Sequence, residues 1–393
     1  MELSAQRLVS ACADEGLDSG IRLGTTLEPV AGKFAPVKPA IYEGGEYQKD
    51  RRWVRDRDGD PHVIDAIIID NVASEANRLE AALKDLRTDL GLPDVVLDLE
   101  DVDLPVHLPR RISAFDMPHR NADAYLRDAT MEGKPFLGTA TGRAIFTATA
   151  DDPSALLEWM PQALLFGFWQ SHLGKKRQQT KLARSWVSEI VGLDPAGGEN
   201  KGRGLKGDPL NLSVSQGVVA GDDDETEWNW AEAARKGGKS GDSLAEIGHG
   251  QVPVSGAPMG VSFADIEQTA SLSFSGLRRI SAGSPERSAA ARALLAALGI
   301  VAHVHAFGRS FSLRSGCDLR PVDPRWVWLG RAADEPLDVA DIDKAKQVFA
   351  DTVAIARSVG LPVGEGNWSV LPLEPHANLR KAITDTWPIS SEE

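Results

Sequence analysis

Cysteine is scarce in this sequence, and its two copies form no recognisable pattern. Cys12 and Cys317 are the only cysteines in 393 residues, and neither belongs to a CxxC pair or a Cys/His ladder. This scarcity argues against a disulfide framework and against a zinc ribbon. It fits a reducing compartment, so we expect a cytoplasmic protein without a structural metal.

Long apolar runs are missing as well. The first 20 residues contain acids and no extended apolar core, which argues against a signal peptide. The longest apolar stretches, such as residues 163–169, are too short to cross a bilayer. We therefore expect no membrane association.

Recognisable catalytic motifs are lacking too. The glycines between residues 197 and 204 match no phosphate-loop pattern, and no GxSxG surrounds Ser255. His303 and His305 share one face of an expected strand, but no third ligand is in register, so we interpret them as structural. No triad or acid/base pair is apparent. The sequence therefore predicts a protein that is not an enzyme and needs no cofactor.

Cations are outnumbered by acids, and the formal net charge is −14. Taken alone, this charge argues against nucleic acid, because affinity for a polyanion comes mainly from Lys and Arg. The acids are unevenly spread, however, and ten of the 57 lie in residues 94–103 and 222–227. Residues 171–206 carry eight basic and three acidic residues. The local charge of one face therefore matters more than the total.

Changes in composition and periodicity divide the chain into five segments. They are an arm or irregular lead-in (1–61), a first mixed region (62–194), a Gly-rich acidic insertion (195–257), a second mixed region (258–383) and a polar tail (384–393). The order of expected strands and helices in the mixed regions predicts an α+β fold, with helices layered on an antiparallel sheet.

Hydrophobic periodicity predicts the individual elements. The clearest is a helix over 72–86, whose apolar residues fall at steps of three and four and which Ser74 is expected to cap. Helices are also expected over 119–130, 153–160, 175–190, 285–298 (ending at Gly299) and 341–359. Strands are expected over 62–70, 163–169, 266–275, 300–307 and 310–315.

The expected helix over 175–190 provides the first candidate binding surface. Arg177, Lys181 and Arg184 would share one face of this helix, opposite its apolar residues. Cations at such a spacing can follow a phosphate backbone, although a solvated helix face is the alternative. The neighbouring cations extend this candidate surface: Lys175, Lys176, Arg203 and Lys206.

Three smaller groups of polar residues are further candidates for binding a sugar-phosphate chain. Asn77 and Arg78 lie off the apolar face of the 72–86 helix, where an Arg78–Glu75 surface pair is the alternative. The second group is His119, Arg120 and Arg127, for which salt bridges with nearby aspartates are the alternative. The third is Arg278, Arg279 and Arg314, beside a strand that is lined by Thr and Ser. A solvated sheet face is the alternative interpretation of this group.

Seven segments, taken in chain order over about residues 60 to 320, together resemble one family. They are IDNVASEANRLEAAL (69–83), PHRNADAYLRD (118–128), ALLFGFW (163–169), KLARSWVSEIVG (181–192), IEQTASLSFSGLRRI (266–280), LLAALGI (294–300) and SLRSGCDL (312–319). These segments are similar to the Cas-seven-type backbone subunit of type I-U (also called I-G) CRISPR systems, within the RAMP superfamily.

The resemblance implies both a fold and a function. It implies an RRM-like, ferredoxin-like palm, helical finger insertions and a thumb, for which the insertion 195–257 is the candidate. Such subunits oligomerise head to tail along a guide RNA (crRNA) beside other Cascade subunits, and they leave the bases free to pair with target DNA. The resemblance to type I systems, in which a separate helicase-nuclease degrades DNA, implies that this chain does not cleave.

Two other functions are open at this stage. One is a RAMP-superfamily endoribonuclease that processes guide RNA, which would need a general base such as His119. The other is a protein-interaction scaffold without nucleic acid, which the acidity and the ten tryptophans suggest.

Overall fold

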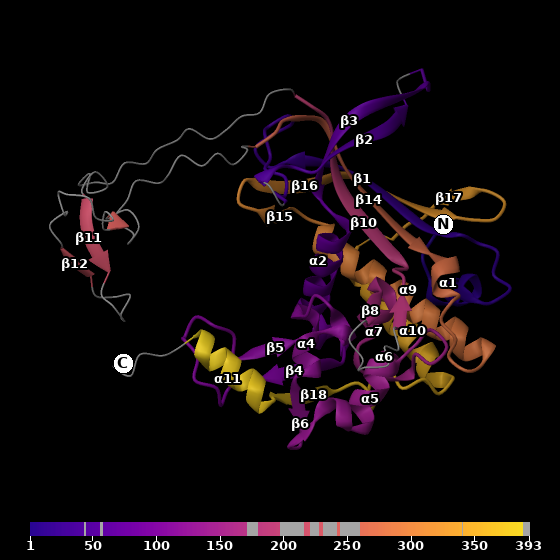
Figure 1. Ribbon diagram of the computed structural model, residues 1–393. Helices are drawn as coiled ribbons and strands as arrows, with labels where there is room; N and C mark the ends of the chain where they lie inside the picture. Colours follow the sequence, from indigo (N-terminus) through magenta and orange to yellow (C-terminus); the bar gives the residue numbers. More distant parts are fainter. Residues whose placement is uncertain are drawn as a thin grey trace. The chain divides into compact units, whose positions relative to one another are not determined.

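A large antiparallel sheet runs through the computed structural model (Figure 1). The structure describes residues 1–42, 45–55, 58–170, 180–196, 216–220, 228–230, 242–243, 260–339 and 341–387. The sheet follows the order β15 (Phe311–Arg314), β16 (Cys317–Leu329), β1 (Gly20–Pro29), β14 (Phe263–Ser273), β10 (Trp186–Pro195), β3 (Pro61–Asp70) and β2 (Lys49–Arg55), and β17 (Asp334–Pro336) pairs with β16. The expectation of an α+β protein with antiparallel sheets is confirmed.

Strand β1 corrects the expectation of an irregular lead-in over 1–61. Ile21, Leu23 and Leu27 are buried and alternate with more exposed positions, which is the period-two pattern of a strand with one buried face. The strand pairs with β14 on one side and β16 on the other. The N-terminal segment therefore supplies an interior strand of the sheet.

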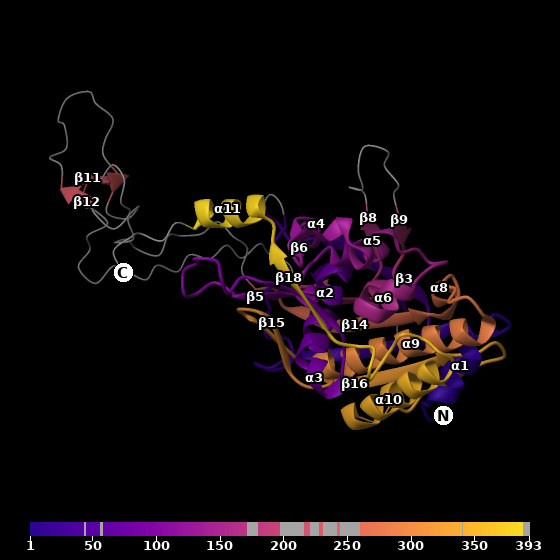
Figure 2. The same cartoon turned by 90° about the horizontal axis from the view of Figure 1, so that it is seen from below.

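Helices cover the sheet and the regions next to it. They are α1 (Ala5–Cys12), α2 (Val72–Asp85), α3 (Arg87–Leu90), α4 (Ala124–Arg127), α5 (Ala140–Thr147), α6 (Ser154–Trp159), α7 (Pro161–Phe166), α8 (Phe274–Leu277), α9 (Pro285–Phe307), α10 (Ile342–Ser358) and α11 (Ala377–Thr386). Helix α9 packs against α1, α2, α7 and α10 (Figure 2). The main core lies between this helical layer and the sheet.

Helix α2 forms where the sequence predicts it, but its cap is different. Leu79 and Leu83 are fully buried on the expected apolar face. The N-cap is Asn71, whose side chain accepts a hydrogen bond from the backbone N–H of Ser74 at 2.9 Å. The hydroxyl of Ser74 instead donates to Asp70. Capping by Ser74 is therefore wrong.

Helix α9 continues eight residues beyond its expected end at Gly299. A Cβ atom at Gly299 would lie 2.5 Å from the indole ring of Trp186. The glycine therefore permits close packing within the helix and does not end it. The expected strand over 300–307 is wrong, and His303 and His305 lie on α9. This helix is long and apolar enough to span a membrane, but it is mostly buried in the core.

Residues 161–195 also differ from expectation. Instead of a strand over 163–169, helix α7 is followed by β8 (Phe168–Gln170). Instead of a helix over 175–190, the described part contains β9 (Thr180–Leu182) and β10. Trp186, Ser188 and Ile190 are buried at alternate positions of β10. The helix was predicted from Leu182, Trp186 and Ile190, whose spacing of four also fits one face of a strand.

A second, smaller sheet supports the region between α2 and α7. Its order is β5 (Arg111–Ser113), β4 (Asp94–Asp98), β18 (Val370–Pro375), β6 (Ala129–Met131) and β7 (Lys134–Pro135). Strand β18 runs parallel to β4. The expected helix over 119–130 is reduced to α4 and a short 3₁₀ turn, η3 (Arg120–Ala122); the other 3₁₀ turns here are η2 (Ala114–Asp116) and η4 (Phe136–Gly138).

The chain divides into two compact units. All elements above belong to the unit formed by Met1–Pro39, Lys49–Pro195 and Ser262–Glu393. The other unit comprises Ala40–Gln48 and Ala196–Val261. Its described strands are β11 (Gln216–Ala220), β12 (Trp228–Trp230) and β13 (Asp242–Ser243), paired in the order β12-β11-β13. The thumb candidate over 195–257 lies mostly outside the described residues.

Candidate functional site

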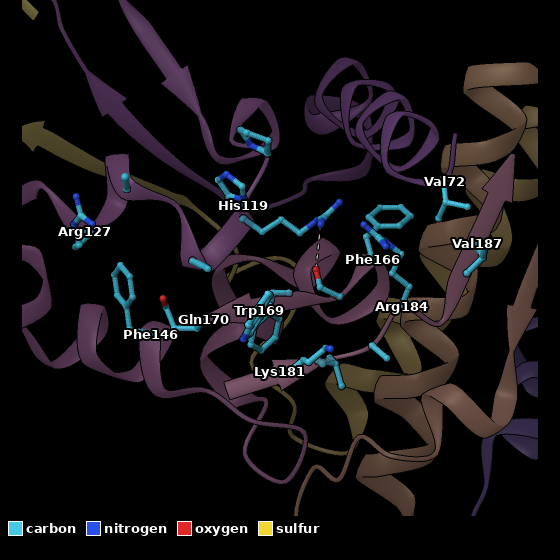
Figure 3. Close-up of a pocket in the computed structure, with 18 residues that line it drawn as sticks. Val72, His119, Arg127, Phe146, Phe166, Trp169, Gln170, Lys181, Arg184 and Val187 are labelled. Atoms are coloured by element: carbon cyan, nitrogen blue, oxygen red, sulfur yellow. Dashed lines mark hydrogen bonds between the residues drawn. The ribbon is translucent and has the colours of Figure 1, made fainter. Parts of the chain in front are cut away.

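A cavity of about 840 Å³ opens between η3, α4 and the β8–β9 hairpin. Eighteen described residues line it (Figure 3). Four of these are Arg or Lys, and none is Asp or Glu: Arg120, Arg127, Lys181 and Arg184. In a chain with a net charge of −14, this is a local reversal of charge. Such a cavity attracts an anionic ligand.

A buried ion pair forms the floor of this cavity. Arg120 donates to both carboxylate oxygens of Glu80, from Nε at 2.7 Å and from Nη2 at 2.8 Å. Its third bond reaches the carbonyl of Gly167 at 3.1 Å (Figure 3). Burial raises the pKa of Glu80 to about 7, while Arg120 opposes this rise. The pair joins α2 to η3 and to the start of β8.

Gly167 permits the backbone geometry that places Arg184 in the cavity. Its φ is +75°, and a Cβ there would lie 2.6 Å from the carbonyl oxygen of Leu182 and 2.8 Å from the amide nitrogen of Arg184. Only glycine allows the two segments to approach this closely without strain. The backbone of 182–184 therefore lies against the β8 end, and the Arg184 side chain lines the cavity.

Arg184 carries a charge that the surrounding protein does not neutralise. Its guanidinium makes no hydrogen bond or ion pair with any described residue. Partial burial and the neighbouring Arg120 guanidinium lower its pKa, and Glu80 raises it. Arg120 already occupies both oxygens of Glu80, so this carboxylate does not pair with Arg184. A bound anion would satisfy the second guanidinium.

Lys181 and Trp169 form the outer wall of the cavity. The Nζ of Lys181 lies 5.6 Å from the centre of the Trp169 ring. The indole is 61% exposed although it belongs to strand β8. An accessible aromatic face beside a cation is a common arrangement for binding single-stranded nucleic acid. Trp169 was not predicted as a site residue, because residues 163–169 were expected to form a buried strand.

His119 and Arg127 complete the polar lining. His119 is exposed, and its backbone N–H donates to the Asp123 side chain. Arg127 forms a two-point pair with Asp128, at 2.8 and 2.5 Å. The expected salt bridge with an aspartate is thus present for Arg127. For Arg120 the partner is Glu80, which the sequence analysis did not consider.

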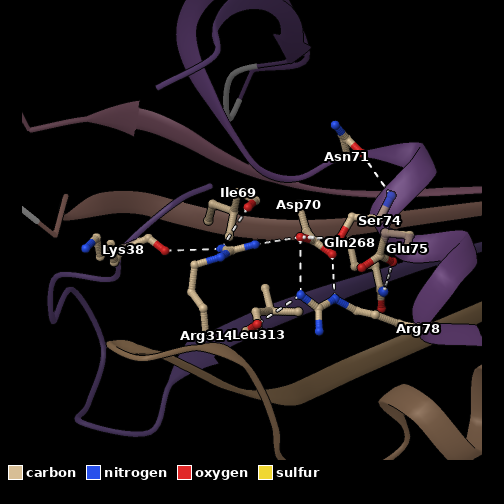
Figure 4. A network of polar contacts seen from close by, with 10 residues as sticks. All are labelled: Lys38, Ile69, Asp70, Asn71, Ser74, Glu75, Arg78, Gln268, Leu313 and Arg314. Atoms are coloured by element: carbon tan, nitrogen blue, oxygen red, sulfur yellow. Dashed lines mark hydrogen bonds and ion pairs between the residues drawn. The ribbon is translucent and has the colours of Figure 1, made fainter. Parts of the chain in front are cut away.

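Arg78 and Arg314 are engaged within the protein. Both donate to the fully buried carboxylate of Asp70, at 2.7 and 2.6 Å (Figure 4). Arg78 also bonds the carbonyl of Leu313, and Arg314 bonds that of Ile69. These bonds join β3, α2 and β15. Arg78 pairs with Asp70 and not with Glu75, and both arginines have structural partners.

Glu75 lies beside this network at the interface of α2 and the sheet. It accepts a hydrogen bond from Gln268 Nε2 at 2.7 Å (Figure 4). Burial, together with the nearby Asp70 carboxylate, raises the pKa of Glu75 to about 8. The side chain is therefore mostly a neutral acid at pH 7.

Arg278 and Arg279 also bond the protein backbone. Arg278 donates to the carbonyls of Ala11, Ala13 and Asp18. Arg279 donates to the carbonyls of Gly276 and Ala183. Arg278 thus fixes the segment between α1 and β1, while Arg279 supports the backbone next to Arg184.

The Thr/Ser face of β14 is exposed, as both of its interpretations require. Thr269 and Ser271 are exposed. Their neighbours on the open side of the sheet include Glu189, across from Thr269 on β10, and Glu267. Carboxylates at these positions disfavour a phosphate backbone on this face.

The remaining candidates are not among the described residues that line the cavity. Asn77 is exposed on α2, and the other five lie outside the described residues: Lys175, Lys176, Arg177, Arg203 and Lys206. The first three fall in the sequence that connects β8 to β9. Among the described residues, no group of three or more His, Cys, Asp or Glu side chains is arranged to hold a metal ion. His303 is buried among aromatic rings, and burial lowers its pKa to about 3.

Comparison with known families gives one match. Residues 21–196 match the model of a family described as CRISPR-associated protein GSU0053. No curated protein matches the chain. The matched range contains every described residue that lines the cationic cavity.

Proposed function

Because residues 21–196 match the model of a family described as CRISPR-associated protein GSU0053, we propose that the chain belongs to this family and binds guide RNA as the repeating backbone subunit of a type I surveillance complex. In this role the protein holds the ribose-phosphate chain and leaves the bases available for target DNA. Sequence is then read by base pairing.

The cationic cavity is the observation that carries this proposal. Its described lining contains four Arg or Lys residues and no carboxylate. Lys181 and Arg184 are the two that have no acidic partner in the described part of the chain. Phosphate contacts of this kind provide affinity without base specificity. The two cations would each contact a phosphate, and the Trp169 ring would stack on a base of any identity.

The order of strands supports an RRM-like palm. Within the large sheet, β16-β1-β14-β10 are neighbours and all pairs are antiparallel. Helix α2 lies between β1 and β10 in the chain, and α9 lies between β14 and β16. This corresponds to the βαββαβ topology of ferredoxin-like folds. The β2–β3 hairpin is an addition at one edge.

The wider assembly is part of the same proposal. Copies of the chain would follow one another along the guide in the cytoplasm, next to other Cascade subunits and away from membranes. Residues 195–257 would form the thumb that reaches a neighbouring copy. Target DNA would be contacted through the guide.

We propose no catalytic activity for this subunit, but one observation favours a ribonuclease as the second candidate. His119 lines the same cavity as Lys181 and Arg184. A histidine near a bound phosphate can act as general base on a ribose hydroxyl. Guide-repeat RNA incubated with wild type and His119→Ala, with Mg²⁺ or with EDTA, separates the candidates. We expect intact RNA in every case; cleavage lost in His119→Ala would establish the enzyme.

Binding to guides of unrelated sequence tests the leading candidate. Fluorescence anisotropy with several labelled RNAs of equal length should give dissociation constants within a few-fold of one another. Strong preference for one sequence would contradict a backbone subunit, because it would require readout of base edges.

A further inference from the structure

A second cavity, of about 460 Å³, lies between the C-terminal end of α9, the N-terminal end of α10 and strands β1 and β16. Its lining is mainly apolar and aromatic, with Trp326 and Phe307 on either side of the buried His303 ring. The volume is ample for one large side chain. Hollows of this kind are where interface anchors such as tryptophan dock.

The mouth of this cavity is acidic. Asp338 and Asp341 line it, together with one cation, Arg309. The sequence from 334 to 343 adds three more exposed acids and no cation: Asp334, Glu335 and Asp343. A docking side chain that is surrounded by cations would therefore bind here more favourably than one surrounded by acids.

Strand β2 presents a side chain with these properties. Trp53 is 73% exposed, although it is a large aromatic residue at the edge of the sheet. Lys49, Arg51 and Arg55 occupy alternate positions along the same strand and so share the face of Trp53. Arg51 is 3.6 Å from the exposed Asp65, an ion pair that contributes little in water.

The two features lie near opposite edges of one sheet. Five strand-to-strand steps separate β2 from β16, which is roughly 24 Å. Each copy can therefore offer its protrusion to one neighbour and its hollow to another, which generates a head-to-tail array that continues from copy to copy. A symmetric dimer, in which each protrusion enters the partner's hollow, would cross-link as dimers only.

We infer that Trp53 of one copy docks into the cavity between α9, α10 and β16 of the next copy. The inference rests on the proposed function, because it names the surface by which subunits would follow one another along a guide. Docking of another copy explains the exposed Trp53 and the cations of β2 better than binding of nucleic acid does. The sequence of the β2–β3 hairpin, residues 49–70, contains six acids and five cations, so it lacks the net positive charge that RNA would need.

Cysteine cross-linking of the full chain tests this surface. Arg51→Cys and Ile342→Cys place thiols beside the protrusion and at the mouth of the cavity, and they leave Trp53 in place. Burial raises the pKa of the native thiols, to about 12 for Cys12 and about 11 for Cys317, so they should stay unreactive. Under mild oxidation the double variant should form a ladder of dimers, trimers and longer species. A mixture of the two single variants should stop at dimers.

Two outcomes would overturn this inference, and a third would support it while rejecting the proposed function. Cross-linking of Arg51→Cys alone would show a symmetric contact through β2. Absence of any ladder, while the variant still retains guide RNA, would reject the surface and leave the proposed function intact. Conversely, a ladder formed by protein that binds no RNA would support the surface and reject the RNA role.

Truncation of the anchor gives an independent measurement. Trp53→Ala should weaken self-association on a guide by about tenfold or more, as for other buried tryptophan anchors. Mass photometry would then show fewer copies per guide. Trp387→Ala is the matched control, because Trp387 is also a partly exposed indole but lies away from β2 and from this cavity. Equal loss in both variants would contradict the assignment.

Discussion

Lys181 and Arg184 differ from the other cations of their cavity in a way that decides their role. Arg120 and Arg127 are bonded to Glu80 and Asp128. Lys181 and Arg184 have no carboxylate partner in the described part of the chain. An arginine held by a buried carboxylate positions neighbouring groups, whereas an unpaired one is available to a ligand.

The double substitution Lys181→Ala and Arg184→Ala should therefore weaken RNA binding to a similar degree for all guides. Each lost phosphate contact should reduce the slope of log affinity against log salt by about 0.7 for a single strand. Anisotropy titrations over a range of salt concentrations measure this slope. Lys381→Ala is the control, because Lys381 is an exposed cation paired with Asp385 on α11. An unchanged slope in the double variant would reject the cavity as the phosphate site.

Glu75 makes a separate prediction about stability. Its pKa is about 8 in the folded protein, well above the ordinary value of 4.5 that we take for the unfolded chain. Between these values the folded protein keeps a proton on Glu75 that the unfolded chain loses. The contribution of Glu75 to the free energy of unfolding is therefore greatest below pH 4.5 and falls as the pH rises towards 8. Over this range, the ionisation of Glu75 lowers the free energy of unfolding by up to about 1.4 kcal/mol per pH unit.

Glu75→Gln keeps the shape and removes the titration. Urea unfolding at several pH values should show a flatter decline of stability for this variant than for wild type between pH 5 and 8. Parallel curves would mean that Glu75 is ionised in the folded state.

At the scale of elements, the sequence was informative where one face of a segment is consistently apolar. The helix over 72–86 was predicted correctly because Leu79 and Leu83 fall on one helical face. Strand β3 was predicted because its β-branched run is buried. Strand β1 could have been found from the alternation of Ile21 and Leu23 with polar positions. Its glycines and threonines concealed this pattern.

The errors have a shared physical origin in tertiary contacts. Gly299 resembles a helix end, yet it is required by an indole that comes from a distant strand. The site shows the same limit. His119, Arg120, Arg127, Lys181 and Arg184 were all named as candidates, but nothing local shows that Glu80 neutralises one of them. Five others were already bonded within the fold or exposed away from the cavity: Asn77, Arg78, Arg278, Arg279 and Arg314.

Gly299 gives a prediction at this scale. In an ordinary helix, Gly→Ala stabilises by about 1 kcal/mol. Here the added Cβ would clash with Trp186, so Gly299→Ala should destabilise by about 1–3 kcal/mol. Gly24→Ala on β1 is the control, because no atom lies within 4 Å of its added Cβ. Denaturant unfolding measures both, and a Gly299→Ala variant as stable as wild type would contradict the packing explanation.

At the scale of the whole molecule, the acidic composition and the cationic cavity have complementary effects. The net charge of −14 opposes non-specific contact with nucleic acid over most of the surface. In the proposed role, this charge would restrict RNA binding to the cavity whose described lining has four cations and no carboxylate. Total charge alone would have suggested a protein-interaction scaffold without RNA.

Purification of the chain with a co-expressed guide and its companion subunits tests the central claim most directly. The ratio of absorbance at 260 and 280 nm should show bound nucleic acid at low ionic strength. RNase treatment should abolish that absorbance, whereas DNase should leave it unchanged. A complex that purifies with the absorbance of protein alone would contradict the account.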